Sequence, residues 1–250
     1  MEENLFGLEI SDINPATNAL FQHAMRFAGS VVDYKELMMM YACAIQEIRT
    51  KLEILDTEYN VRYRRNPITS IISRLKKSSS IMEKLMRKNQ GLTLQSIEEY
   101  VHDVAGIRVV CPYIDDIYTI AEALLKQDDI TLVERKDYIK NPKPNGYRSL
   151  HLIVKVPVFF SEQRKEMAVE IQIRTIAMDF WASLEHQMKY KQEIPNQQEI
   201  VDQLKKCADV ISRTDQEMLE IRRQIDESSD PQTEEDILLE KIRKLDINIM

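Results

Sequence analysis

Apolar residues recur at helical spacing over a long stretch near the start of the chain. From Val31 to Asn60 they stand mostly three or four positions apart: Leu37, Tyr41, Ala44, Ile45, Ile48, Leu52 and Leu55. This spacing places them on one face of a helix, so we predict a long amphipathic helix here. Asn66-Pro67 interrupts the pattern, because proline and the residue before it disfavour helix. Residues 1–30 show only weak periodicity and stay unassigned.

The middle of the chain alternates between strand-like and helix-like segments. Apolar runs and period-two alternation predict strands over 68–76, 105–114, 130–139, 149–160 and 167–175. Helical spacing predicts helices over 78–89, with a serine cap, and over 94–104, 114–127 and 176–191. Residues 163–166 are expected to form an exposed turn. Near-heptad spacing over 197–225 predicts a second long helix, and residues 234–245 fit a short one.

The order of these segments predicts an α/β protein of the α+β kind. Tight loops join several strands, which favours a mixed, mostly antiparallel sheet flanked by helices over a doubly wound arrangement. The sequence contains neither G-x-G-x-x-G nor G-x-x-x-x-G-K-[ST], so side chains must provide any phosphate binding. We divide the chain into an N-terminal helical region (1–65), a core (66–191) and a C-terminal helical extension with an acidic tail (192–250).

Composition narrows the class of protein. Apolar residues make up 44% and charged residues 30% of the 250 residues, as in soluble globular domains. No apolar run reaches the roughly 18 residues that cross a bilayer, and the acidic N-terminus is unlike a secretory signal. The three cysteines are widely spaced and fit neither a disulfide framework nor a zinc site. We therefore expect a cytoplasmic protein without a membrane partner.

The net charge of −7 is unevenly distributed along the chain. Residues 62–108 contain ten Lys or Arg against four Asp or Glu, whereas residues 226–246 contain eight Asp or Glu against three Lys or Arg. An acidic protein with a basic centre points to a local anionic ligand rather than to wholesale nucleic-acid binding, and we expect no DNA partner. A solvated charged face explains the same pattern, and composition alone favours that explanation.

Two carboxylates stand at strands of the predicted sheet. Asp103 precedes the strand that begins near residue 105, and Glu170 shares one face of the 167–175 strand with Gln172 and Arg174. Mg²⁺ takes one or two carboxylates together with phosphate oxygens and waters, so this pair suits a magnesium site for phosphoryl-type transfer. A capping aspartate and a surface glutamate explain the two residues about equally well. His102-Asp103 also resembles a metal-phosphohydrolase pair, but the chain has only four histidines.

Five basic residues come from three consecutive elements near Asp103. They are Arg74, Lys76, Lys84, Arg87 and Arg108. Arginine binds phosphate oxygens through two N–H donors and lysine binds them as a compact charge. The set could therefore converge on a nucleotide triphosphate. Taken singly, each of them is more often a solvated charge. The hypothesis rests on their placement around one acidic site.

The loop and strand "NPKPNGYRSLHLIVKVP", residues 141–157, carry more functional side chains than a plain turn requires. Pro142, Pro144 and Gly146 bend the chain, and Tyr147 would present its ring beside Lys143 and Asn145. A ring, an amide and a cation together suit a purine nucleotide. A β-turn with a buried tyrosine is a slightly better explanation from this stretch alone.

Five segments, taken in order, resemble the RelA/SpoT family of guanosine tetra- and pentaphosphate synthetases. They are "RLKKSSSIMEKL", "HDVAGIRVV", "NGYRSLHL", "VEIQIRT" and "DFWASLEHQMKYK", and they lie between about residues 68 and 191. The resemblance implies a nucleotidyltransferase-like core. It also implies transfer of pyrophosphate from ATP to the 3′-hydroxyl of GDP or GTP, with release of AMP.

The resemblance assigns roles to single residues of this chain. Arg74, Lys76, Lys84, Arg87 and Arg108 would bind ATP. Asp103 and Glu170 would be the catalytic carboxylates that hold Mg²⁺, and Glu170 would also take the proton of the 3′-hydroxyl. Tyr147 would stack on guanine, and Lys143, Asn145, His151 and Gln172 would lie near the GDP or GTP.

The length of the chain matches synthetase-only members of this family, which form homotetramers through flanking helices. About 65 residues precede the core and contain a single histidine, too few for the metal-dependent hydrolase domain of long members. Preference among GDP, GTP and GMP stays open, as does regulation by (p)ppGpp or single-stranded RNA. The alternatives are a non-catalytic nucleotide- or RNA-binding regulator on the same core, and another kind of nucleotidyltransferase.

Overall fold

The computed structural model describes residues 15–189, 197–228 and 241. Within this part of the chain, one five-stranded sheet has the order β1-β2-β5-β4-β3. The strands are β1 (Ser70–Leu75), β2 (Ala105–Cys111), β3 (Thr131–Asp137), β4 (Leu150–Phe159) and β5 (Arg164–Thr175). β2 and β5 run parallel, and the other neighbouring pairs are antiparallel. The prediction of a mixed, mostly antiparallel sheet is confirmed.

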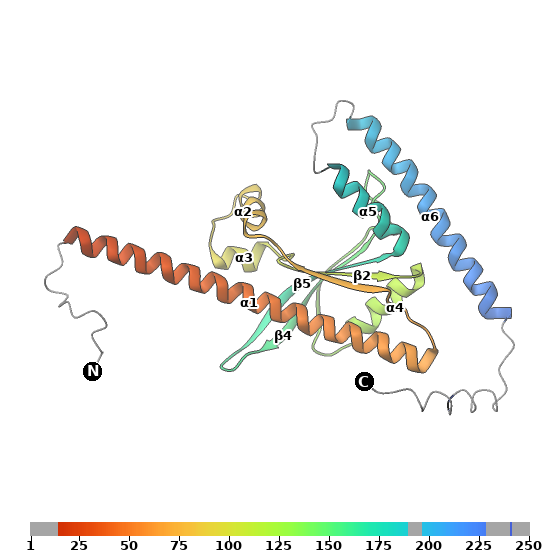
Figure 1. Ribbon diagram of the computed structural model, residues 1–250, viewed down its shortest axis with the longest axis horizontal. Helices are drawn as coiled ribbons and strands as arrows, with labels where there is room; N and C mark the ends of the chain where they lie inside the picture. The colour runs from red at the N-terminus through yellow and green to blue at the C-terminus, as the bar shows by residue number, and fades with distance from the viewer. Residues whose placement is uncertain (1–14, 190–196, 229–240, 242–250) are drawn as a thin grey trace.

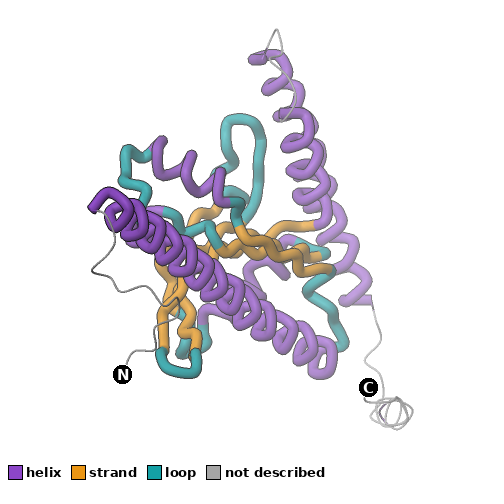
Figure 2. Tube along the Cα trace, turned by 60° about the vertical axis from the view of Figure 1, so that its left-hand side comes forward, coloured by secondary structure: helices purple, strands orange, loops and turns teal. Residues whose placement is uncertain are grey.

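Six helices accompany the sheet in the described residues (Figure 1). They are α1 (Pro15–Tyr63), α2 (Ser78–Arg87), α3 (Leu94–Tyr100), α4 (Ile114–Leu125), α5 (Ile176–Lys189) and α6 (Gln197–Ser228). α1 crosses the molecule beside the sheet, and α6 rises at the opposite side, next to α5 (Figures 1 and 2). None of the helices in the described ranges is both long enough and apolar enough to cross a membrane.

α1 and α4 pack on one face of the sheet and form the main core with it. The predicted apolar face of α1, including Ile48 and Leu52, is fully buried against strand residues such as Ile171 of β5. Ile117 and Ile120 of α4 are also fully buried in this cluster. The helix and the sheet therefore share one hydrophobic core.

The opposite face of the sheet is polar at its centre. Since side chains alternate along a strand, burial of Ile171 on the core side turns Glu170 and Gln172 to the other side. The strand register brings further residues beside them: Gly106 is opposite Glu170 in β2, and His151 is opposite Gln172 in β4. The three central strands β2, β5 and β4 thus form one surface, on which β4 and β5 carry polar side chains and β2 carries a glycine.

Several predicted boundaries differ from the structure. α1 begins at Pro15 rather than near Val31, and α3 ends at Tyr100, so the segment before β2 is not helical. The residue before α2 is Lys77, which makes no side-chain cap, so the expected serine cap is wrong.

The expected turn at residues 163–166 is also wrong over most of its length. Arg164 already pairs with Phe159 in the hairpin of β4 and β5. The outer end of this hairpin is exposed and charged, which conceals the strand pattern. The predicted helix at 234–245 lies outside the described residues.

Candidate active site

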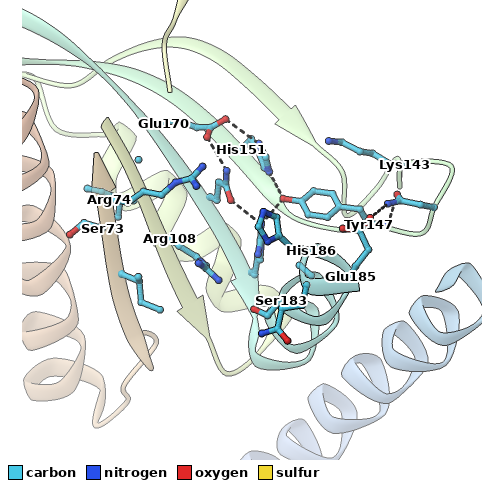
Figure 3. Close-up of a pocket in the computed structure, with 18 residues that line it drawn as sticks. Ser73, Arg74, Arg108, Lys143, Tyr147, His151, Glu170, Ser183, Glu185 and His186 are labelled. Carbon is cyan, nitrogen blue, oxygen red and sulfur yellow. Dashed lines mark hydrogen bonds and ion pairs between the residues drawn. The ribbon is translucent and has the colours of Figure 1, made fainter. Parts of the chain in front are cut away.

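A cavity of about 620 Å³ opens on the polar face of the sheet (Figure 3). Its walls come from β1, β2, β4, β5, α5 and the loop before β4. Its charged and polar lining includes Arg74, Arg108, Lys143, Asn145, Tyr147, His151, Glu170, Gln172, Arg174, Glu185 and His186. All five residues predicted to contact the guanine nucleotide therefore line one cavity, together with Glu170.

Glu170 lines the cavity, and two neighbours orient its carboxylate. Gln172 Nε2 donates a hydrogen bond to Glu170 Oε2 at 2.8 Å. His151 Nδ1 lies 3.5 Å from Glu170 Oε1. Burial alone would raise the pKa of Glu170, but hydrogen bonds from His151 and Gln172 outweigh it and lower the pKa below its usual range. Glu170 is therefore a carboxylate at neutral pH.

Asp103 is held by two lysines just before β2. Lys76 Nζ lies 2.9 Å from Asp103 Oδ2, and Lys84 Nζ lies 2.8 Å from Oδ1. Burial opposes ionisation of Asp103, but the hydrogen bonds and charges of Lys84 and Lys76 dominate and lower its pKa. The two lysines predicted to bind ATP thus neutralise the second carboxylate here.

The donor chemistry of this region suits a magnesium ion shared with a polyphosphate. Asp103 lies just before β2, the parallel neighbour of the strand that carries Glu170, and it is close enough for its charge to raise the pKa of Glu170. No group of three or more His, Cys, Asp or Glu residues in the described ranges forms a complete metal site. Two carboxylates with phosphate oxygens and water are a usual magnesium environment. The residues therefore fit a metal that arrives with its nucleotide.

The five predicted ATP-binding residues fall into three places. Arg74 of β1 and Arg108 of β2 line the cavity on the left of Figure 3, whereas Tyr147 lies on the right. Lys76 and Lys84 lie at Asp103, outside the cavity lining. Arg87 is exposed in the last turn of α2 and is not a lining residue.

The cavity side of the loop before β4 carries an aromatic cluster around Tyr147. The hydroxyl of Tyr147 lies 2.7 Å from His151 Nε2 and accepts a hydrogen bond of 2.7 Å from Arg174 Nη2. Lys143 Nζ lies 4.8 Å from the centroid of the Tyr147 ring and 4.6 Å from that of Tyr138. These contacts fix the Tyr147 ring at the cavity wall beside a cation.

A tight turn gives this loop its shape. Gly146 N donates to Lys143 O at 2.8 Å, and Gly146 has a φ of +89°, a conformation that favours glycine. Asn145 Nδ2 donates to Glu185 Oε1 at 3.0 Å, which ties the loop to α5. Lys143, Asn145 and Tyr147 are thereby brought to the same side of the loop.

Arg174 and Asp179 connect the two halves of the cavity. Arg174 donates to Tyr147, to Gln172 Oε1 at 2.8 Å and to Asp179 Oδ1 at 3.0 Å. Arg108 Nη1 donates to the same Asp179 oxygen at 2.9 Å. Sequence reasoning placed Arg174 on the correct face of β5 but gave it no role, and it missed Asp179.

Comparison with known proteins agrees with this geometry. Residues 73–195 match the family model described as a region found in RelA/SpoT proteins. The GTP pyrophosphokinase YwaC of Bacillus subtilis is 44% identical over 196 residues, which are 78% of this chain and 92% of that protein. The GTP pyrophosphokinase YjbM of the same organism is 37% identical over 195 residues, 78% of this chain and 91% of that protein.

Solved structures show the same relationship. The small alarmone synthetase 2 of Bacillus subtilis superposes with a TM-score of 0.69 at 44% identity, covering 77% of this chain and 99% of that one. The small alarmone synthetase 1, bound to its product pppGpp, gives 0.70 at 37% identity, covering 78% and 98%. The chain belongs to the RelA/SpoT family. Within that family, it is one of the small alarmone synthetases.

Proposed function

We propose that the protein transfers pyrophosphate from ATP to the 3′-hydroxyl of GDP or GTP and releases AMP. One observation carries the proposal: Glu170, an ionised and oriented carboxylate, shares one cavity with two arginines and an aromatic ring, and its strand β5 lies between β2 and β4 (Figure 3). Two nucleotides could bind on either side of it with the reacting groups near the carboxylate. Phosphoryl-type transfer depends mainly on such positioning and on neutralisation of charge.

The donor half is the side of Arg74 and Arg108. Guanidinium groups bind phosphate oxygens through two donors each, so these residues suit the triphosphate of ATP. Lys76 and Lys84 would bind phosphate by turning away from Asp103. Arg87 would have to reach in from the surface of α2. Mg²⁺ held by Asp103 and Glu170 would neutralise charge on the phosphates.

The acceptor half is the side of Tyr147. Guanine would stack on the Tyr147 ring, and Lys143, Asn145, His151 and Gln172 would contact the base or its sugar and phosphates. The 3′-oxygen would bond to the β-phosphorus of ATP, and the bond from that phosphorus to the α–β bridging oxygen would break. AMP leaves with the bridging oxygen, and the 3′-hydroxyl proton goes to Glu170.

Replacement of the central carboxylate tests this function. In Glu170→Gln, we expect AMP and alarmone formation from ATP and GDP to fall at least about a hundredfold, as for loss of a general base, while the fold is kept. Glu166→Gln is the matched control, because Glu166 lies on the same strand but is exposed and pairs with Arg164. Chromatography of the nucleotides measures both products.

The products also separate the alternatives. Full activity of Glu170→Gln would refute its assignment. Release of pyrophosphate instead of AMP would indicate nucleotidyl transfer, and nucleotide or RNA binding without turnover would indicate a non-catalytic regulator.

We also infer a cytoplasmic homotetramer from the resemblance of the flanking helices to those of the family. Exposed apolar residues on α6, such as Val210 and Ile221, support a contact between chains. Sedimentation measurements test the number of chains.

A further inference from the structure

The loop that carries Tyr147 rests directly on the C-terminal helix α6. Gly146 lies so close to α6 that a Cβ added to it would come within 2.6 Å of Ala208 Cβ and 3.1 Å of Lys205 Cα. Contacts shorter than 3.0 Å require a shift of one partner. The position of this turn is therefore set by α6 as well as by the sheet.

Arg148 fastens the same loop to the same turn of α6. Its Nη1 donates to Gly146 O at 3.1 Å and to Ala208 O at 3.2 Å, so one guanidinium bridges the loop and the helix backbone. Its Nη2 lies 3.1 Å from Asp209 Oδ1. The Arg148 side chain is only 15% exposed, whereas Asp209 is 53% exposed. The backbone bridge is therefore better shielded from water than the ion pair.

A small apolar cluster completes the contact between the loop and α6. Trp181 and Ala208 are buried, and Tyr147 and Leu204 pack against them. Trp181 Nε1 donates to Leu204 O at 3.0 Å, and its ring centroid lies 6.5 Å from that of Tyr147. Tyr147 thus has one side in the cavity and another in the joint with α6.

We propose that α6 is the positioning element of the acceptor half, and that Arg148 and Ala208 set the affinity for the guanine nucleotide through Tyr147. The inference rests on the proposed function for the identity of the nucleotide. A purely structural contact would lower stability without distinguishing the two substrates. A positioning contact should act mainly on GDP, because neither Arg74 nor Arg108 belongs to this cluster, and Arg108 contacts α5 at Asp179, which lies outside it.

Two substitutions perturb the joint from opposite sides. Arg148→Ala removes the bridge between Gly146 and Ala208. Ala208→Leu adds side-chain volume where the Gly146 turn already touches α6. Lys206→Ala is the control, since Lys206 is an exposed cation in the same turn of α6. Arg148→Lys keeps the positive charge but cannot bond to both carbonyls at once. Its KM for GDP should therefore lie between those of Arg148→Ala and the wild type.

The measurements are KM for GDP and for ATP, each at a saturating concentration of the other nucleotide. We expect KM for GDP to rise about tenfold or more in Arg148→Ala and Ala208→Leu, and KM for ATP to change less than about twofold. Lys206→Ala should match the wild type. Equal increases for both nucleotides, or a lower melting temperature with unchanged KM for GDP, would overturn the inference.

Fluorescence provides a second measurement that does not need turnover. Trp181 is the one tryptophan of the chain and lies in the joint, so GDP binding should change its emission more than ATP binding does. Wild-type protein that forms no AMP would refute the proposed function, and the titration would still decide the role of α6. If Arg148→Ala does not fold, Arg148→Lys and Ala208→Leu provide the same comparison. A GDP affinity in those variants equal to that of the wild type would refute the positioning role of α6.

Discussion

The ring and the hydroxyl of Tyr147 can be tested separately. The ring faces the cavity beside Lys143, whereas the hydroxyl contacts His151 and Arg174. Tyr147→Ala removes both, and Tyr147→Phe removes only the hydroxyl. If the ring is the platform for guanine, the two variants should differ strongly in KM for GDP.

The size of the effect follows from the contacts. Stacking of a base on an aromatic side chain contributes about 1–3 kcal/mol, so Tyr147→Ala should raise KM for GDP between about fivefold and 150-fold. Tyr147→Phe keeps the ring, and Arg174 keeps its hydrogen bonds to Gln172 and Asp179. Tyr147→Phe should instead lower the unfolding free energy by about 1–3 kcal/mol, because the hydrogen bonds of the hydroxyl are lost.

Steady-state kinetics with each nucleotide varied in turn, together with urea unfolding, measures these effects. KM for ATP should stay within about twofold of the wild type in both variants, because Tyr147 lies away from Arg74 and Arg108 (Figure 3). An equal rise in KM for ATP would refute the division of the cavity into two halves. A rise in KM for GDP as large in Tyr147→Phe as in Tyr147→Ala would refute stacking as the role of the ring.

Two further predictions concern buried charges. Arg174→Lys keeps the charge but cannot reach Tyr147, Gln172 and Asp179 together, so kcat/KM for GDP should fall about tenfold or more. A kcat/KM equal to that of the wild type would show that the guanidinium group is dispensable. Burial raises the pKa of Asp116 to about 6 from 3.8, although Arg65 opposes the shift. Between these values the folded chain holds a proton that the unfolded chain has released, so the stability contributed by Asp116 falls as pH rises through this window. The unfolding free energy of Asp116→Asn minus that of the wild type should therefore rise by about 2 kcal/mol from pH 4 to pH 7. A decrease would show that the ion pair with Arg65 dominates.

The elements that could be predicted from the sequence are those whose apolar spacing follows from packing against the sheet. The apolar period of α1 was recognisable from Leu37 onwards, where its residues become buried in the core. Residues 31–33 of the same helix are exposed and add nothing to this buried face. For a related reason, the outer end of the β4–β5 hairpin was mistaken for a turn: three charged residues follow one another there, and none of them is buried.

The site was predictable where a strand determined the direction of a side chain. Alternation in β5 placed Glu170, Gln172 and Arg174 on one face, and all three line the cavity. The pairing of Lys76 and Lys84 with Asp103 was not predictable, because these residues meet only when a strand end, a helix and a loop are folded together. Asp179 was missed for a related reason, since nothing in a short helical segment indicates that two arginines from different strands converge on it.

The segment "YRSLH", residues 147–151, shows how residues of one motif divide between chemistry and support. Tyr147 and His151 line the cavity, and their side chains contact each other. Arg148 points instead to α6, and Ser149 is fully buried with its hydroxyl donating to Ile173 O at 3.2 Å. An arginine in such a motif would ordinarily be assigned to a phosphate, but here the guanidinium bonds to backbone carbonyls and lies outside the cavity lining. A match to the motif therefore indicates that the acceptor loop is present, and only the contacts decide which of its residues can bind the nucleotide.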